Sequence, residues 1–98
     1  MEHIIRKASA ADIDSIVDIE RASFSDPWSC AMIADDVCDR EFGIVVNVLE
    51  IKGKVAGYYF YYPFSDDLAD FAIAPEYRRQ GYGRLLLRHF LDMATFLH

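Results

Sequence analysis

The sequence has few of the features that define secreted, membrane-spanning or nucleic-acid-binding proteins. Its only two cysteines, Cys30 and Cys38, are expected on one helix about 12 Å apart, beyond the reach of a disulfide. No C-x-x-C pair is present, so no metal site is expected. The longest apolar run, 55–64, contains four tyrosines and is shorter than the roughly 18 residues of a membrane span. The N-terminus lacks the apolar segment of a secretory signal, so we expect a cytoplasmic protein.

Basic residues are also scarce, and they are unevenly placed. The chain holds 10 lysines and arginines against 16 acidic residues, for a net charge of −6. Residues 1–77 carry a net charge of −9, whereas residues 78–98 carry +3. An acidic body argues against nucleic-acid binding. The basic island indicates a small anionic ligand; the alternative is that its arginines merely solvate a helix.

The 98 residues, 53% of them hydrophobic and 27% charged, predict one compact domain spanning 1–98. Hydrophobic periodicity predicts the order β-α-α-β-β-β-α, an α/β (α+β) arrangement in which helices flank an antiparallel meander. The expected strands are 3–7, 44–51, 55–62 and 68–74, and the expected helices are 10–22, 29–37 and 83–97.

Local signals support these boundaries. Ser9 is the expected N-cap of the first helix, with Asp12 completing a capping box. The buried stripe of that helix is formed by residues at helical spacing: Ile13, Ile16, Val17 and Glu20. Lys52-Gly53 predicts a tight hairpin turn, and Gly57 a bulge. The four tyrosines of 55–62 are interpreted as core residues rather than a substrate cage.

The loop 78–84, which joins the last expected strand to the last helix, carries the strongest functional signal. The start of a helix has unpaired N–H groups and a partial positive charge. Gly81 and Gly83 allow a ligand to approach that backbone closely, and the neighbouring arginines add charge. These features are typical of a pyrophosphate site. The chain has neither the lysine of a P-loop nor the third glycine and parallel strands of a dinucleotide fingerprint.

The segment 71–86, FAIAPEYRRQGYGRLL, resembles motif A of the GCN5-related N-acetyltransferase (GNAT) family, [RQ]-x-x-G-x-[GA]. The segment 24–29, FSDPWS, resembles the P-W-S segment of its RimI-type branch, whose members acetylate the N-terminal amine of a ribosomal protein. The resemblance implies the N-terminal part of the GNAT acyl-CoA N-acyltransferase fold, with acetyl-CoA as co-substrate. It places the following residues against that molecule: Phe71, Ala72, Ile73, Arg79, Gln80, Gly81, Tyr82, Gly83 and Arg84.

Two residues depart from the branch's pattern. Asp70 stands where asparagine is common, and Phe71 is bulkier than the usual aliphatic residue. Trp28 is open to two interpretations, as a wall of the substrate groove or as a core residue. The base and acid that the family implies lie on elements beyond His98, so no catalytic residue is assigned to this chain, and the domain is interpreted as incomplete at its C-terminus.

Three functions follow from this resemblance. The first is an N-acetyltransferase acting on the N-terminal amine of a protein, and the second is an acetyltransferase that differs only in taking a small-molecule amine as its acceptor. The third is a non-catalytic CoA-binding or assembly module, which the missing catalytic residues suggest. The expected partners are acetyl-CoA, an amine and a second copy of the chain in a homo-oligomer, without nucleic acid or membrane. An uncovered strand edge and helix face underlie the expectation of self-association.

Overall fold

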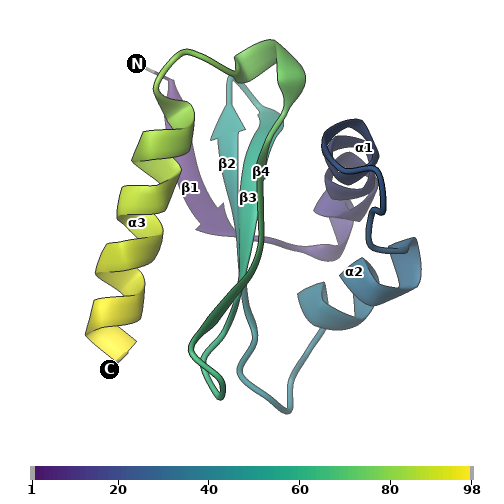
Figure 1. Ribbon diagram of the computed structural model, residues 1–98, viewed down its shortest axis with the longest axis vertical. Helices are drawn as coiled ribbons and strands as arrows, with labels where there is room; N and C mark the ends of the chain where they lie inside the picture. Colours follow the sequence, from purple (N-terminus) through teal and green to yellow (C-terminus); the bar gives the residue numbers. More distant parts are fainter. Residues whose placement is uncertain (1, 98) are drawn as a thin grey trace.

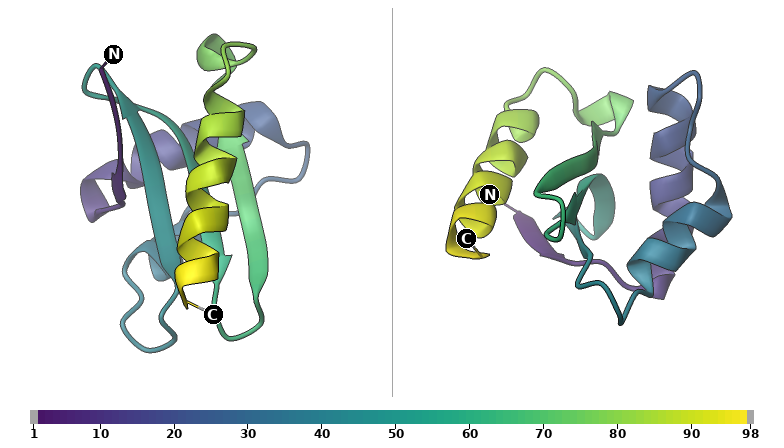
Figure 2. Two further views of the ribbon diagram at one scale, coloured as in Figure 1. Left: turned by 90° about the vertical axis from the view of Figure 1, so that its left-hand side faces the viewer. Right: turned by 60° about the horizontal axis from the view of Figure 1, so that its bottom comes forward.

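The computed structural model describes residues 2–97, in which a four-stranded sheet lies between two helical layers. Figure 1 shows the sheet almost edge-on, with α3 against one face and α1 and α2 against the other, and Figure 2 shows the same layers from two further directions. None of the helices among these residues is long and apolar enough to cross a membrane. The elements are β1 (His3–Lys7), η1 (Ala10–Asp12), α1 (Ile13–Ser23), α2 (Cys30–Val37), β2 (Val45–Ile51), β3 (Lys54–Tyr62), β4 (Asp67–Ile73), η2 (Pro75–Tyr77) and α3 (Tyr82–Leu97).

The sheet has the order β1-β2-β3-β4, and every pair is antiparallel, as predicted. Alternate residues of β2 enter different cores because successive side chains of a strand point to opposite faces. Val46 and Val48 pack in the core beneath α1 and α2, whereas Leu49 and Ile51 pack beneath α3. The predicted change to a period of two is therefore confirmed.

The turn between β2 and β3 has the predicted geometry. Lys52 and Gly53 have φ values of 52° and 81°, the left-handed pair that a tight hairpin turn requires. The register then shifts between Leu49 and Glu50, which pair with Gly57 and Val55. The predicted irregularity thus lies next to Gly57.

The tyrosines of β3 are core residues. Tyr58, Tyr59 and Tyr61 are fully buried, and each hydroxyl has a hydrogen-bond partner, as burial of a phenol requires. β3 can bury three such large side chains because it is an interior strand with helices on both faces. This confirms the core interpretation for these three tyrosines and excludes an aromatic cage built from their rings, whereas Tyr62 is half-buried and donates its hydroxyl to Asp36.

The start of α1 differs in detail from a simple capped helix. Ser9 N–H donates to Asp12 Oδ2 at 2.8 Å, as the predicted capping box requires. Asp12 is also held by Arg6, whose Nη1 and Nη2 lie 2.8 and 2.9 Å from its two oxygens. The chain first forms the short 3₁₀ turn Ala10–Asp12, and α1 begins at Ile13.

The contact between β3 and β4 depends on Gly57. A Cβ atom at this position would lie 2.7 Å from Ile73 Cδ1 and 2.9 Å from the Ala72 carbonyl oxygen. We expect Gly57→Ala to lower the free energy of unfolding by about 1–3 kcal/mol, since the backbone of β4 must move to admit the methyl group. Urea denaturation measures the change.

Gly83→Ala is the matched control. A Cβ atom at Gly83, in α3, meets only Ile73 Cγ1 at an ordinary 3.8 Å. Alanine there should raise the stability by about 0.5–1 kcal/mol because it lowers the entropy of the unfolded chain. Equal effects of the two substitutions would contradict the close approach at Gly57.

Candidate functional site

The loop between β4 and α3 is shaped by two residues with left-handed backbone. Arg79 has a φ of 63° and Gly81 a φ of 87°, so the chain reverses sharply before the helix begins. A Cβ atom at Gly81 would meet no heavy atom within 4 Å. The backbone at this position therefore borders open space that a ligand can enter.

The first turn of α3 supplies hydrogen-bond donors to that space. Leu85 N–H bonds to the Gly81 carbonyl oxygen at 3.1 Å, which closes the first turn. The N–H groups of 82–84 precede it and have no acceptor within the helix. Arg79 and Arg84 are exposed beside them, and within residues 2–97 neither guanidinium forms an ion pair. This combination of donors and positive charge suits an anion such as a pyrophosphate.

Two other predicted residues of the loop have more specific placements. The Gln80 side chain donates to the Glu76 carbonyl oxygen at 3.0 Å and so braces the loop. The Tyr82 ring packs edge-on against Tyr77 and against His3, with centroids 6.2 and 6.4 Å away. Tyr82 therefore offers its backbone N–H to the loop, while its ring joins α3 to the N-terminal strand.

Arg78 belongs to the same basic island, but its side chain forms hydrogen bonds within the protein. Its Nε donates to the Ile73 carbonyl oxygen at 2.9 Å, and its Nη2 donates to Ser23 Oγ at 2.8 Å. The side chain thus ties the end of β4 to the end of α1. Sequence alone could not separate this arginine from its neighbours, because the distinction depends on a partner in α1.

β4 is an edge strand, and its free edge leads toward the loop. Ala74 N–H bonds to the Ala56 carbonyl oxygen of β3, so the alternation of an antiparallel ladder turns the backbone of Ala72 toward β3 as well. Phe71 and Ile73 then face the open edge with the Phe71 carbonyl oxygen and the Ile73 N–H, since Phe71 N–H donates to Asp70 Oδ1 and the Ile73 carbonyl oxygen accepts from Arg78 Nε. A hollow of about 350 Å³ follows this edge, lined by Ser23, Phe24, Phe71, Ala72, Ile73 and Arg78.

A second hollow, of about 310 Å³, continues along β4 toward its N-terminal end. Its lining residues come from the end of α1, the loop that follows α1, and β4: Glu20, Phe24, Ser25, Asp26, Trp28, Ala69 and Asp70. Phe24 borders both hollows. The Trp28 ring packs edge-on against Phe60 at 5.3 Å, as a core residue does, and it also lines this hollow, so its place in a substrate groove stays a prediction.

Glu20 and Asp70 are chemically prominent residues that the sequence analysis did not assign to the site. Both are buried, with exposed fractions of 2% and 9%. Burial, together with a hydrogen bond to the neighbouring Glu20 and repulsion from its charge, raises the pKa of Asp70 to about 8. A glutamate within the apolar stripe of a helix was the sequence signal for Glu20. Its proximity to Asp70 could not be read from positions 50 residues apart.

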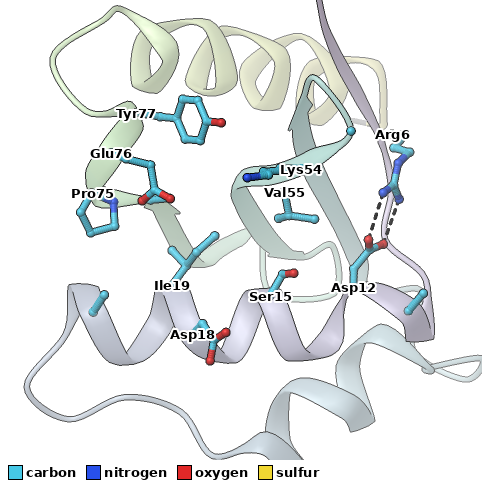
Figure 3. Close-up of a pocket in the computed structure, with 14 residues that line it drawn as sticks. Arg6, Asp12, Ser15, Asp18, Ile19, Lys54, Val55, Pro75, Glu76 and Tyr77 are labelled. Atoms are coloured by element: carbon cyan, nitrogen blue, oxygen red, sulfur yellow. Dashed lines mark hydrogen bonds and ion pairs between the residues drawn. The ribbon is translucent and has the colours of Figure 1, made fainter.

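A separate pocket lies between α1, η2 and the turn that joins β2 to β3 (Figure 3). It has a volume of about 530 Å³ and a lining of mixed charge, in which Arg6 and Asp12 form an ion pair at 2.8 Å. Glu76 and Tyr77 approach it from η2, but none of the residues 79–84 lines it. This pocket is therefore distinct from the loop and the free edge of β4.

The described fold is that of the GNAT acetyltransferases, and comparison with known proteins agrees. The model of the acetyltransferase (GNAT) family matches residues 13–96, and the chain belongs to that family.

Its relatives include ribosomal protein bS18-alanine N-acetyltransferases. The Escherichia coli (strain K12) enzyme of this name is 30% identical over 90 residues, which cover 90% of this chain and 59% of that protein. A Bacillus subtilis protein provisionally given the same name is 31% identical over 91 residues, covering 91% of this chain and 60% of its own length. The chain therefore spans about three fifths of the length of these relatives.

Solved structures support the fold. The crystal structure of the E. coli ribosomal-protein-S18-alanine N-acetyltransferase superposes with a TM-score of 0.77 at 26% identity, covering 94% of this chain and 59% of that one. The PaiA N-acetyltransferase of Thermoplasma acidophilum, solved in complex with coenzyme A, gives a TM-score of 0.76 at 15% identity, covering 97% of this chain and 73% of that one. At that identity, the second comparison concerns the fold alone.

The raised pKa of Asp70 predicts a specific dependence of stability on pH. The folded chain keeps a proton on Asp70 that the unfolded chain has already lost above its ordinary pKa of 3.8. Stability from this group is therefore present at low pH and declines as the pH rises toward about 8. We expect Asp70→Asn to make the decline in thermal midpoint between about pH 4 and pH 8 shallower than in the wild type.

Asp26→Asn serves as the control, because Asp26 lines the same hollow but is exposed. The thermal midpoint of Asp26→Asn should change with pH as steeply as that of the wild type. Parallel slopes for the wild type and Asp70→Asn would show that Asp70 ionises in its ordinary range.

Proposed function

We propose that this chain binds acetyl-CoA and serves an N-acetyltransferase that modifies the N-terminal amine of a protein. The observation that carries the proposal is the free edge of β4 leading into the glycine- and arginine-containing start of α3, in a member of the GNAT family. The names of its relatives support a ribosomal protein as the acceptor. Such a substrate favours the cytoplasm as the place of action.

The loop and the first turn of α3 would hold the pyrophosphate of acetyl-CoA. Its negative charge would meet the N–H groups of 82–84, the guanidinium groups of Arg79 and Arg84, and the open backbone at Gly81. Gln80 and Gly83 would contribute bracing and room for close approach. The basic island within an acidic chain is consistent with a ligand of this limited size.

The free edge of β4 would hold the extended pantetheine arm. Amides of that arm can pair with the Phe71 carbonyl oxygen and the Ile73 N–H as an added strand would. The small side chain of Ala72 lies in the hollow along this edge. A backbone N–H at this edge would also polarise the thioester carbonyl during attack by the amine.

Coenzyme A binding tests the proposed pyrophosphate site. Arg84→Ala should weaken binding about tenfold to hundredfold, the effect of losing a charge-assisted hydrogen bond. Gly81→Val should abolish binding, since the branched side chain would fill the open space and strain a backbone with a φ of 87°. Isothermal titration calorimetry measures both, with circular dichroism to confirm folding.

Arg88→Ala is the matched control because Arg88 is an exposed arginine one turn further along α3. It should bind coenzyme A as the wild type does. Unchanged affinity in folded Arg84→Ala and Gly81→Val would exclude this loop as the pyrophosphate site.

We also propose that the chain forms a homo-oligomer through the outer face of α3, which leaves the free edge of β4 to the pantetheine arm. On α3, Leu87, Leu91 and Leu97 are 41%, 51% and 48% exposed, so a partner would remove substantial apolar surface from water.

Light scattering over a dilution series tests the assembly. The wild type should be larger than a monomer at high protein concentration, and Leu91→Glu should shift it toward the monomer because a charge would be buried at the interface. Arg88→Glu, on a neighbouring face of the same helix, should have a smaller effect. A wild type that remains monomeric throughout the series would refute the proposal.

A further inference from the structure

Two phenylalanines at one end of the sheet contact each other and are nevertheless exposed to solvent. Phe42 and Phe64 have exposed fractions of 63% and 66%, and their ring centroids lie 6.2 Å apart. Phe64 also stacks on Tyr62, with centroids 5.5 Å apart and ring planes 13° from parallel. We call these three side chains the aromatic patch. Contiguous exposed apolar groups commonly mark an interaction site, whereas a single exposed apolar residue does not.

Hydrogen bonds within the chain hold the aromatic patch in place. The Asp39 carboxylate accepts the backbone N–H groups of Phe42 and Ile44 at 3.1 and 3.0 Å, which closes the loop between α2 and β2. Tyr62 donates its hydroxyl to Asp36, near the end of α2, at 2.6 Å. The rings are therefore arranged before a partner arrives, and a preorganised surface loses less entropy on binding than a mobile one.

Carboxylates surround the aromatic patch. The segments 35–44 and 62–67 hold six acidic residues and a single basic one: Asp35, Asp36, Asp39, Glu41, Asp66 and Asp67 against Arg40. Burial raises the pKa of Asp36, and the charges of Asp39 and Asp35 raise it further. Burial, the bond to Asp36 and the charges of Asp36 and Asp67 likewise raise the pKa of the Tyr62 hydroxyl. These carboxylates therefore act on one another, and the surface around the three rings is negative.

A surface of this kind fits a basic polypeptide. Guanidinium and ammonium groups bind the faces of aromatic rings, and they also pair with carboxylates. A nucleic acid or an anionic membrane would be repelled by the same carboxylates. A second copy of the chain would be repelled as well, because its net charge is −6. Charge complementarity therefore favours a segment rich in lysine and arginine.

The aromatic patch lies at the opposite end of β4 from the loop 78–84. Figure 1 shows the turn between β3 and β4 and the loop before β2 at one end of the sheet, with the start of α3 at the other. The six residue steps from Asp67 to Ile73 span about 20 Å of strand. Acetyl-CoA on the loop and on the C-terminal part of β4 would leave the aromatic patch uncovered. A protein acceptor could contact it while its amine reaches the thioester, and to that extent the inference rests on the proposed function.

We propose that the aromatic patch and the carboxylates around it dock a lysine- and arginine-rich segment of the acceptor protein. Each contact of a cation with an exposed ring or carboxylate is weak, so affinity comes from several contacts made by one segment. The surface would therefore select the protein that carries the amine rather than the amine itself. Added salt should weaken the docking, because it screens exposed charges.

The test is an NMR titration of the ¹⁵N-labelled 98-residue chain with a peptide of alternating arginine and alanine. The peptide is acetylated at its N-terminus and amidated at its C-terminus, so it carries no amine that could be acetylated. It should shift the backbone amide signals of 41–44 and 64–67 and leave those of 79–85 unchanged. The same peptide with citrulline in place of arginine keeps the shape without the charge. It should bind at least about tenfold more weakly, as expected for loss of charge-assisted hydrogen bonds.

Variants separate the contribution of the rings from that of the charges. Phe42→Ser and Phe64→Ser combined in one chain should weaken binding of the arginine peptide about fivefold to twentyfold, the effect of losing two exposed cation–π contacts. Glu41→Gln should weaken it about twofold to fivefold, the effect of losing an exposed ion pair. Ile4→Ser and Asp18→Asn are the matched controls, because they change an exposed apolar residue of β1 and an exposed carboxylate of α1. Both controls should bind the peptide as the wild type does.

Several results would overturn the docking surface. They are amide signals of 41–44 and 64–67 that do not respond to the arginine peptide, equal affinity for the arginine and citrulline peptides, and unchanged affinity in the combined phenylalanine variant. Shifts of the same signals on dilution of the chain alone would show that a second copy occupies the aromatic patch, which also contradicts the proposal.

A titration of the same sample with coenzyme A tests the proposed function separately. Coenzyme A should shift the amide signals of 79–85 and leave those of 41–44 and 64–67 unchanged. A chain that binds the arginine peptide but not coenzyme A would contradict the proposed function and retain a surface for basic segments. The reverse result would contradict the docking surface alone.

Discussion

The hydrogen bond between the Tyr58 hydroxyl and the Glu20 carboxylate connects the core of this protein to its candidate site. Tyr58 lies on β3, which is buried by helices on both faces, so its hydroxyl must find an acceptor inside the protein. Glu20 supplies that acceptor from α1, and its second oxygen binds the Trp28 N–H. One carboxylate therefore fixes α1 against the sheet and the loop after α1 beside β4. The hollow that contains Asp70 exists because these two contacts hold its walls in place.

Charge is arranged along β4 in a way that matches two different reactants. Toward its C-terminal end, the strand leads to exposed arginines and to the N–H groups of a helix start. Near its middle, it carries Asp70 beside Glu20, with no cationic side chain lining the hollow there. An anionic ligand and a cationic one would be drawn to different sections of a single strand. Arg78 does not change this arrangement of charge, because its side chain donates hydrogen bonds to the Ile73 carbonyl oxygen and to Ser23.

Local patterns in the sequence predicted the elements because each element depends on nearby residues. The alternation of β2, the Lys52-Gly53 turn and the Ser29 cap, which accepts the Met32 N–H at 3.1 Å, all act over a few positions. The roles of Arg78, Tyr82 and Asp70 could not be predicted in this way. Each is decided by a partner distant in sequence: Ser23 for Arg78, His3 for Tyr82 and Glu20 for Asp70. The family motif identified the loop, but it did not distinguish side chains that support the loop from those that face its open side.

Asp70 is the position at which pH decides whether the buried pair of carboxyl groups favours the fold. An asparagine, common at this position in the RimI-type branch, could donate an N–H to the Glu20 carboxylate and would introduce no second charge. When it is ionised, the aspartate lacks that donor and leaves one buried oxygen unsatisfied. Because burial and Glu20 raise the pKa of Asp70 to about 8, its carboxyl group is largely protonated at neutral pH and can donate to Glu20, as an asparagine N–H would. The second buried charge therefore appears only as the pH rises, and it then lowers the stability of the folded chain.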